Sequence, residues 1–176
     1  MTEKTKVFIS YARKDDYLNE VSSDEEHSYH HDPKRSFTRQ VYNALTDAGF
    51  DVWWDRESLP SRGKEFNDEI AKAVRESQYL VYIGGSHALE SDYVRVEWEH
   101  ALAQCIPVIP VIRTIDFPQL PPEIGTRNGV DMRDMAFFTE KIAELINVNV
   151  FVRVVYTQKM AIAGLEELID LTKLKV

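Results

Sequence analysis

A loop rich in cations is the first segment whose residue types suggest chemistry. Arg56, Arg62 and Lys64 lie around Gly63, and a helix is expected to begin just after them, at Phe66. Side-chain cations together with the free N–H groups of a helix start suit a phosphate group. An ordinary solvated turn would have the same composition, so the sequence leaves both interpretations open.

The second candidate is a carboxylate on the helix expected at 91–104. A helix turns by about 100° per residue, so residues three or four positions apart lie on the same face. One face of this helix is an apolar stripe and is expected to be buried. It comprises Val94, Trp98, Ala101, Leu102 and Cys105, the last of which directly follows the expected helix. Glu97 falls on the edge of this stripe, and Tyr93 lies one turn before it on the same edge. The spacing predicts a half-buried carboxylate beside an aromatic ring, although a purely structural glutamate would give the same pattern.

Some familiar chemical motifs are present only in part. Ser61 and Lys64 have the S-x-x-K spacing, but that motif requires a helix start in another fold. Gly63–Lys64 lacks the upstream glycine and the following hydroxyl residue of a P-loop. Asp55 ends a strand as in a phospho-accepting receiver domain, but an acidic pair close behind the first strand and a late lysine are missing.

Metal-ligand residue types gather in one polar segment. The cluster consists of Glu25, Glu26, His27, His30, His31 and Asp32. No regular element is expected there to fix the ligand geometry, so the prediction is a solvated loop and no metal site. The whole stretch 15–36 is expected to be a surface insertion, since structureless segments of this length are uncommon inside a compact domain.

Hydrophobic patterning predicts alternating strands and helices around these candidates. The elements expected in order are a strand at 7–9, a helix at 37–48, a strand at 50–54, a helix at 66–76, a strand at 79–83, a helix at 91–104, a strand at 106–112, a weak strand at 129–132 and a helix at 137–146. This alternation predicts an α/β fold with a doubly wound, five-stranded parallel sheet and helices on both faces. Ligands bind beyond the C-terminal ends of such strands, so the loops after Ile9, Trp54 and Ile83 are expected to share one rim.

The last thirty residues do not continue the alternation of strands and helices. A sixth strand is expected at 148–155 and an amphipathic helix at 161–174. We therefore expect one domain over 1–146, followed over 147–176 by a C-terminal strand–helix extension or the start of another domain. The chain is expected to be a piece of a longer protein.

The composition argues against some classes of binding partner. The 176 residues include 21 basic and 29 acidic side chains, giving a net charge of −8, which argues against a nucleic-acid or anionic-membrane binder. No apolar run approaches the roughly 20 residues that span a bilayer. Cys105 is the one cysteine, so no intramolecular disulfide is possible and a reducing, cytoplasmic setting is expected.

Several of these segments together resemble one family. They are the run from Phe8 to Tyr11 followed by Arg13, the run AGFDVWWD from Ala48 to Asp55, Gly63 and Phe66 before a helix, the run SDYVRVE from Ser91 to Glu97 with Ala101, and the strand IPVIPVI from Ile106 to Ile112. In combination they resemble the Toll/interleukin-1 receptor (TIR) domain of bacterial type. The resemblance implies a flavodoxin-like fold and, for many members, cleavage of NAD⁺ between nicotinamide and ribose.

The resemblance also implies roles for individual residues. Glu97 matches the catalytic glutamate of the family, and NAD⁺ is then the substrate, with no cofactor needed. Phe66 and Tyr93 are expected to stack on nicotinamide or adenine, and Arg13, Arg62 and Lys64 to meet the pyrophosphate. Ser10, Tyr11 and Asp55 are further candidates at the rim. Tyr93 and Val94 depart from the tryptophan and cysteine that many enzymatic members have at these positions.

Two functions from different classes are compatible with this resemblance. The first is an NAD⁺ nucleosidase that yields nicotinamide and linear or cyclic ADP-ribose, is activated by self-association with other TIR domains, and acts in anti-phage defence. The second is a non-catalytic module that recruits other TIR domains. A third variant, base exchange or other nucleotide processing, is also kept. Retention of an acidic residue at Glu97 favours the enzyme.

Overall fold

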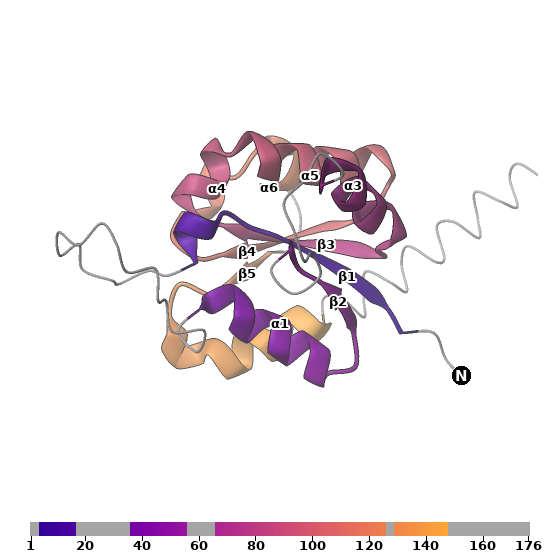
Figure 1. The fold of residues 1–176 in the computed structure, drawn as a ribbon. Coiled ribbons are helices and arrows are strands. Elements are labelled where there is room, and N and C mark those ends of the chain that lie inside the picture. The colour runs from indigo at the N-terminus through magenta and orange to yellow at the C-terminus, as the bar shows by residue number, and fades with distance from the viewer. Residues whose placement is uncertain (1–3, 17–35, 56–65, 126–128, 148–176) are drawn as a thin grey trace, which may run out of the picture.

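The sheet has five strands, all parallel, in the order β2-β1-β3-β4-β5 (Figure 1). A computed structural model describes residues 4–16, 36–55, 66–125 and 129–147. The strands are β1 (Lys6–Ser10), β2 (Asp51–Trp53), β3 (Tyr79–Gly84), β4 (Val108–Ile112) and β5 (Val130–Asp131). The predicted flavodoxin-like parallel sheet is confirmed.

Helices cover both faces of the sheet, as Figure 1 shows. The labelled helices are α1 (Phe37–Asp47), α3 (Phe66–Glu76), α4 (Ser86–Glu90), α5 (Asp92–Ala103) and α6 (Pro122–Gly125), with single 3-10 turns at Arg13–Asp15, Phe117–Gln119 and Met135–Phe137. α1 packs on one face with a last helix over 138–147, and α3, α4, α5 and α6 pack on the other. None of the described helices is long and apolar enough to cross a membrane.

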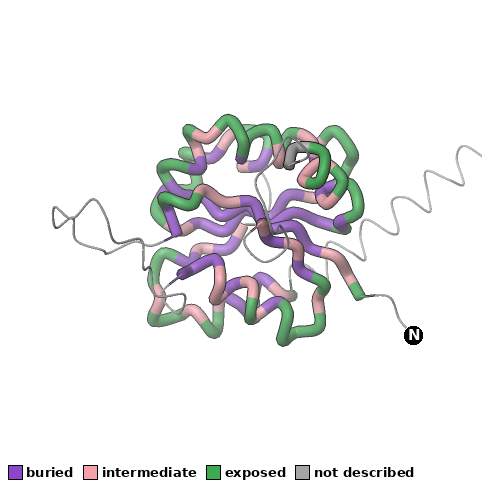
Figure 2. Tube along the Cα trace, in the orientation of Figure 1, coloured by how far each residue is buried: buried purple, intermediate pink, exposed green. Residues whose placement is uncertain are grey.

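The central strands are buried on both faces, which explains their unbroken apolar sequences. Every residue of β3 and of β4 is buried (Figure 2). Side chains of alternating residues enter two separate cores, so Ile9 packs towards α1 whereas Phe8 packs towards α5. Ser10 follows Phe8 by two residues and therefore faces the α5 side of the sheet.

Helix ends follow the signals in the sequence. The side chain of Ser36 accepts a hydrogen bond from the backbone N–H of Arg39 at 3.0 Å and begins α1. Gly49, predicted as the cap that follows this helix, has φ +94°. Ser91 begins α5 in the same way as Ser36, by accepting from the N–H of Val94 at 3.4 Å.

The structure differs from the sequence prediction at several places. The short helices α4 and α6 were not predicted, because four or five residues are too few to show a helical period. Cys105 was expected on the buried stripe of α5 but is exposed. The helix ends at Ala103, and Cys105 has φ 58°, which turns its side chain away from the helical stripe.

Both ends of the expected surface insertion are buried. Asp15, Asp16 and Ser36 have at most 3% of their surface exposed, although the sequence analysis placed them in a surface segment. Their polar atoms are hydrogen-bonded to the starts of helices, and these hydrogen bonds offset the free-energy cost of burying polar groups. The metal-ligand-like cluster of residues 25–32, the expected strand at 148–155 and the expected helix at 161–174 lie outside the described residues.

Candidate functional site

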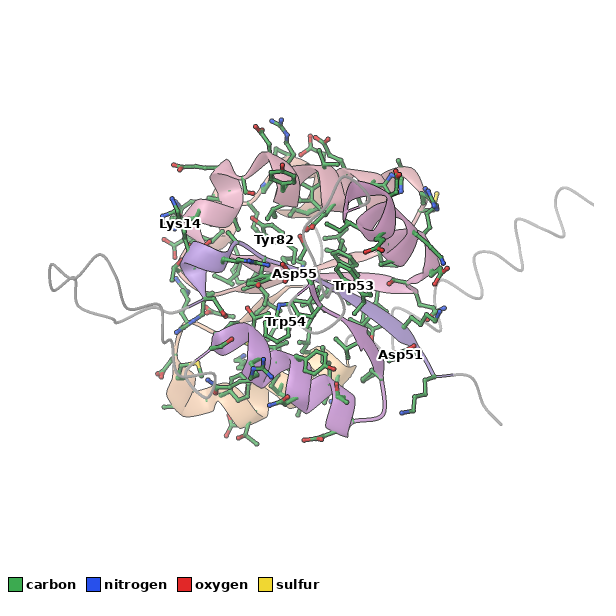
Figure 3. The ribbon with its side chains drawn as sticks, in the orientation of Figure 1. Lys14, Asp51, Trp53, Trp54, Asp55 and Tyr82 are labelled. Carbon is green, nitrogen blue, oxygen red and sulfur yellow. The ribbon has the colours of Figure 1, made fainter. Side chains whose placement is uncertain are left out.

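Five of the predicted site residues gather at one edge of the sheet, beyond the C-terminal ends of β1 and β2. They are Ser10, Tyr11, Arg13, Asp55 and Glu97. Figure 3 shows Asp55 at the end of β2, between the two helical layers. The sequence analysis predicted that the loops after Ile9, Trp54 and Ile83 share one rim. The residues after β1 and β2 lie there together with α5, and the residues after β3 contact the same turn, where Asp15 accepts from the N–H groups of His87 and Ala88.

Ser10 joins β1 to α5 through its side chain. Its hydroxyl donates a hydrogen bond to Oε2 of Glu97 at 2.5 Å, and Ser10 is fully buried. Glu97 itself is only partly exposed, as the edge position on the helical stripe predicted. The contact fixes the carboxylate against the strand end, where parallel sheets bind ligands.

The surroundings of Glu97 favour its neutral form. Burial raises the pKa of Glu97 to about 8; the hydrogen bond from Ser10 acts to lower it, and the negative charge of Asp55 raises it further. A carboxyl group with such a pKa is mostly protonated at neutral pH. Raised pKa values of this kind are concentrated at functional sites, although structural groups show them as well.

Asp55 is held by two residues of the turn after β1. Its Oδ1 accepts from the hydroxyl of Tyr11 at 3.0 Å, and its Oδ2 forms an ion pair with Arg13 at 2.5 Å. The preceding residue, Trp54, is fully buried and anchors this position, with the Tyr42 ring 5.6 Å and the Arg39 guanidinium 5.1 Å from its own ring. Asp55 thus follows β2 by two residues and is held by side chains of the turn after β1.

A pocket of about 280 Å³ opens between α3 and α5. Its lining comprises Ile70, Ala71, Val74, Asp92, Tyr93, Val96, Glu97 and His100. Tyr93 is 68% exposed and Val96 59%, so an aromatic ring and an aliphatic side chain are presented to solvent beside the carboxylate. The pocket offers two acidic groups, Asp92 and Glu97, together with His100, one aromatic surface and largely apolar walls, which suits a flat ring that carries positive charge.

Asp15 and Asp16, which the sequence analysis assigned to the ends of a surface insertion, have a structural role beside the site that it did not predict. The 3-10 turn at Arg13–Asp15 folds them back against the rim. Asp15 accepts from the backbone N–H of Ala88 at 2.8 Å, and Asp16 accepts from that of Thr38 at 2.8 Å. Each carboxylate therefore satisfies the free N–H groups at the start of a helix, one at α4 and one at α1.

Three predicted residues are not placed. Arg62 and Lys64 lie outside the described residues. Phe66 is the first residue of α3, and its side chain also lies outside what is described. The stacking and pyrophosphate-binding roles expected for these residues remain predictions.

The sequence profile of the TIR domain family matches residues 28–146, about two thirds of the chain. The chain belongs to the TIR domain family. The family includes NAD⁺ glycohydrolases as well as signalling scaffolds, so membership leaves the choice between these two functions open. The matched residues include Asp55, Tyr93 and Glu97 of the site, whereas β1 with Ser10 precedes them.

Solved structures support the TIR fold for the whole described unit. The TIR domains of the activated Roq1 resistosome, which directly recognises the pathogen effector XopQ, match with a TM-score of 0.59 and 18% identity, over 82% of this chain and 98% of that one. The TIR domain of the Toll-related receptor TRR-2 from Hydra magnipapillata gives 0.58 and 14%, over 84% and 97%. These identities establish likeness of fold alone.

A third structure shows the same TIR fold within a longer chain. It is a metazoan TIR-STING receptor from C. gigas, solved in complex with 2',3'-cGAMP, with a TM-score of 0.56 and 17% identity. The match covers 78% of this chain but 38% of that one. None of the curated proteins matches the chain.

Proposed function

We propose that this TIR domain is an NAD⁺ nucleosidase that cleaves the bond between nicotinamide and ribose, with Glu97 as the catalytic residue. The observation that carries the proposal is the placement of Glu97: its carboxylate is fixed by Ser10 at 2.5 Å and lines the same pocket as Tyr93. A structural glutamate would need neither an open pocket nor an exposed aromatic neighbour. The products are nicotinamide and linear or cyclic ADP-ribose.

Cleavage of the nicotinamide–ribose bond requires one carboxylate. The leaving group is a cationic pyridinium that departs as neutral nicotinamide, so no general acid is required. Positive charge then develops on the ribose in an oxocarbenium-like transition state. An ionised Glu97 in a site of low dielectric constant stabilises that charge far better than water does.

The other residues of the rim bind the substrate in this proposal. Tyr93 stacks on the nicotinamide ring, and Phe66 contributes a second aromatic surface. Arg13, Arg62 and Lys64 meet the pyrophosphate, for which guanidinium and ammonium groups are suited. Tyr11 and Asp55 stand at the rim between these two regions, where Tyr11 donates to Asp55.

The setting of the reaction is part of the same proposal, and it rests on the resemblance of the sequence to TIR domains of bacterial type. We propose that activity depends on self-association with other TIR domains, in the cytoplasm of a cell that uses NAD⁺ depletion or the ADP-ribose product against phage.

Chromatography of NAD⁺ incubated with the concentrated full chain tests the proposal. We expect nicotinamide to be released by the wild type and by Glu99→Gln, a control at an exposed acidic position on the same helix. Glu97→Gln is expected to lower kcat by at least about 100-fold, the loss typical of a removed electrostatic stabiliser. Equal turnover by Glu97→Gln and the wild type would remove Glu97 from the mechanism.

The second candidate function is a scaffold for homotypic binding. The exposed Tyr93 and Val96 on α5 favour it, since exposed apolar groups are common at protein interfaces. Absence of turnover by the wild type, even when the protein is assembled at high concentration, would favour the scaffold over the enzyme.

A further inference from the structure

Three side chains form a row along the face of α5 that lines the pocket. Tyr93, Glu97 and His100 are spaced by four and then three residues, so they follow one another along one face of the helix. The row spans about 10 Å along the helix axis. α3 lines the same pocket with apolar side chains that include Ile70 and Val74. The proposed function uses Tyr93 and Glu97, and it leaves His100 without a role.

His100 lies at the end of this row that is farther from the rim. α5 begins soon after β3 ends and finishes just before β4 begins, so its successive turns lie farther and farther from the C-terminal edge of the sheet. Tyr93 is therefore the nearest of the three to the rim, and His100 lies almost one turn beyond Glu97. Helical residues three positions apart have Cβ atoms about 5–6 Å apart. A ring whose bond to ribose lies at Glu97 thus has its far side close to His100.

The contact with Gln104 determines which nitrogen of His100 is left for a ligand. The side-chain amide of Gln104 donates from its Nε2 to Nε2 of His100 at 3.1 Å. An amide nitrogen is a donor and not an acceptor, so Nε2 of His100 accepts and the proton of the neutral ring is on Nδ1. Gln104 is exposed whereas His100 is half-buried. The contact thus engages the ring from the solvent side, and the Nδ1–H group remains as a donor for a ligand.

The nicotinamide ring carries a group that such a donor can bind. Its carboxamide is in the meta position to the ring nitrogen, on the side of the ring away from the ribose bond, and the carbonyl oxygen accepts hydrogen bonds. In a mostly apolar pocket, a few polar groups fix the orientation of a flat ligand. A ring that lies between Tyr93 and His100, with its ribose bond at Glu97, directs this carbonyl oxygen towards His100.

We propose that His100 is a specificity-determining residue, which selects pyridinium leaving groups that bear a meta carbonyl by donating its Nδ1–H to that oxygen. This inference rests on the proposed function for its substrate. A ring without the carbonyl would remove water from the N–H of His100 and give it no acceptor in exchange. Sites built around a hydrogen bond discriminate against such analogues for this reason.

Three dinucleotides that differ only in the base test the proposal. They are NAD⁺, its 3-acetylpyridine analogue, which keeps the carbonyl but lacks the amide nitrogen, and its unsubstituted pyridine analogue, which lacks both. Values of kcat/KM are measured with the concentrated full chain, as wild type and as His100→Leu. Pyridine is the poorer leaving group with any enzyme, so the informative quantity is how the substitution changes the ratio of the values for two substrates.

We expect His100→Leu to reduce the preference for NAD⁺ over the pyridine analogue roughly tenfold, the effect of one lost hydrogen bond. The preference for NAD⁺ over the acetyl analogue is expected to stay within about twofold, because both bases keep the acceptor. His100→Asn places an amide N–H near the position of Nδ1 and is expected to keep most of the wild-type preference. An equal fall in kcat/KM for all three substrates in His100→Leu is the result of a purely structural role, and it would overturn the inference.

The matched control is the other histidine at a helix of the same layer. His87 on α4 is hydrogen-bonded through its Nδ1 to Asp15 at 2.8 Å, and it does not line the pocket. His87→Leu is expected to leave the ratios between the three substrates unchanged, whatever it does to stability. A change in these ratios as large as that in His100→Leu would contradict a specific role for His100.

NMR tests the contact without requiring turnover. In the full chain labelled with ¹⁵N-histidine, millimolar nicotinamide is expected to shift the Nδ1 signal of His100, assigned with His100→Leu, and pyridine is not. Absence of a shift with saturating nicotinamide, or an equal shift with pyridine, overturns the inference whatever the turnover. If no dinucleotide is cleaved, the proposed nucleosidase fails, and a shift specific to nicotinamide still supports the contact between His100 and the carbonyl.

Discussion

The carboxylate of Asp15 accepts hydrogen bonds from the backbone N–H groups of His87 and Ala88, at 3.1 and 2.8 Å. It thereby joins the turn after β1 to the helix after β3, at the boundary where the strand order reverses. Doubly wound sheets commonly bind ligands at this boundary. Here a side chain of the protein fills the position, and the candidate site lies to one side, over β1 and β2.

The close approach of Asp15 depends on Gly85. A Cβ atom at Gly85 would lie 2.4 Å from the carboxylate of Asp15. Gly85→Ala is therefore expected to lower the free energy of unfolding by about 1–3 kcal/mol, the usual cost of overpacking. Urea denaturation measures it, with Gly125→Ala as control because the nearest atom there is at 3.4 Å. Equal stability of the two variants would show that Asp15 moves aside at no cost.

Loss of the Ser10 hydroxyl is expected to reduce activity through Glu97. The hydrogen bond lowers the pKa of Glu97, so Ser10→Ala raises that pKa and leaves less carboxylate at neutral pH. We expect kcat/KM at pH 7 to fall roughly tenfold, as for other residues that hold a catalytic ligand in place. The acidic limb of the pH profile of kcat/KM is expected to move to higher pH.

A matched serine separates this effect from a general loss of stability. Ser77 is also buried, but its hydroxyl donates to the carbonyl of Ala73 at 2.8 Å, at the end of α3. Ser77→Ala is expected to lose comparable stability while keeping the wild-type pH profile. A profile shifted to the same extent in both variants would contradict the specific role of Ser10.

The raised pKa of Glu97 makes stability depend on pH. The folded protein binds this proton more tightly than the unfolded chain, so the folded state gains from it below the unfolded pKa of glutamate, near 4.3. The gain is lost as pH rises through the folded pKa of about 8. Glu97→Gln is therefore expected to stabilise the protein at pH 8.5 by at least about 2 kcal/mol relative to its effect at pH 4.

Urea denaturation of wild type and Glu97→Gln at both pH values measures this difference. Glu99→Gln is the control, because Glu99 is exposed on the same helix and its ion pair with Arg95 spans 3.9 Å. A stability difference for Glu97→Gln that stays the same at pH 4 and pH 8.5 would show that Glu97 ionises in its ordinary range.

Tyr93 is expected to contribute to substrate binding through its ring. Tyr93→Ala should raise KM for NAD⁺ roughly tenfold, since stacking on an aromatic side chain contributes about 1–3 kcal/mol per base. Tyr93→Phe keeps the ring and is expected to stay within about twofold of the wild type. Because Tyr93 is 68% exposed, neither change should alter the fold. An unchanged KM for Tyr93→Ala would place the nicotinamide elsewhere.

Local patterns in the sequence predicted the scaffold and the position of Glu97. Long apolar runs at β3 and β4 are strong strand signals, and the helical period of α5 placed Glu97 at the boundary of the buried stripe. The partner of Glu97 is a different matter. Ser10 lies 87 positions away, and only the packing of α5 on β1 brings the two together.

Asp15 and Asp16 show why sequence patterns miss buried polar residues. A buried aspartate is stable where backbone N–H groups point at it, and those groups are the N–H of His87 at the start of α4 and of Thr38 at the start of α1, both far along the chain. The short α4 has no detectable period of its own, so its start could not be predicted. Gly84–Gly85 was a partial signal, since adjacent glycines often mark a close approach of the chain.

The side chain of Asp16 also accepts a hydrogen bond from the hydroxyl of Ser36 at 2.8 Å. The backbone carbonyl of Asp16 accepts one from the N–H of Phe37 at 3.3 Å. These hydrogen bonds hold positions 16 and 36 of the chain next to each other. Because this contact fixes both ends of residues 17–35, that segment can be shortened, lengthened or exchanged by mutation without moving α1 away from β1.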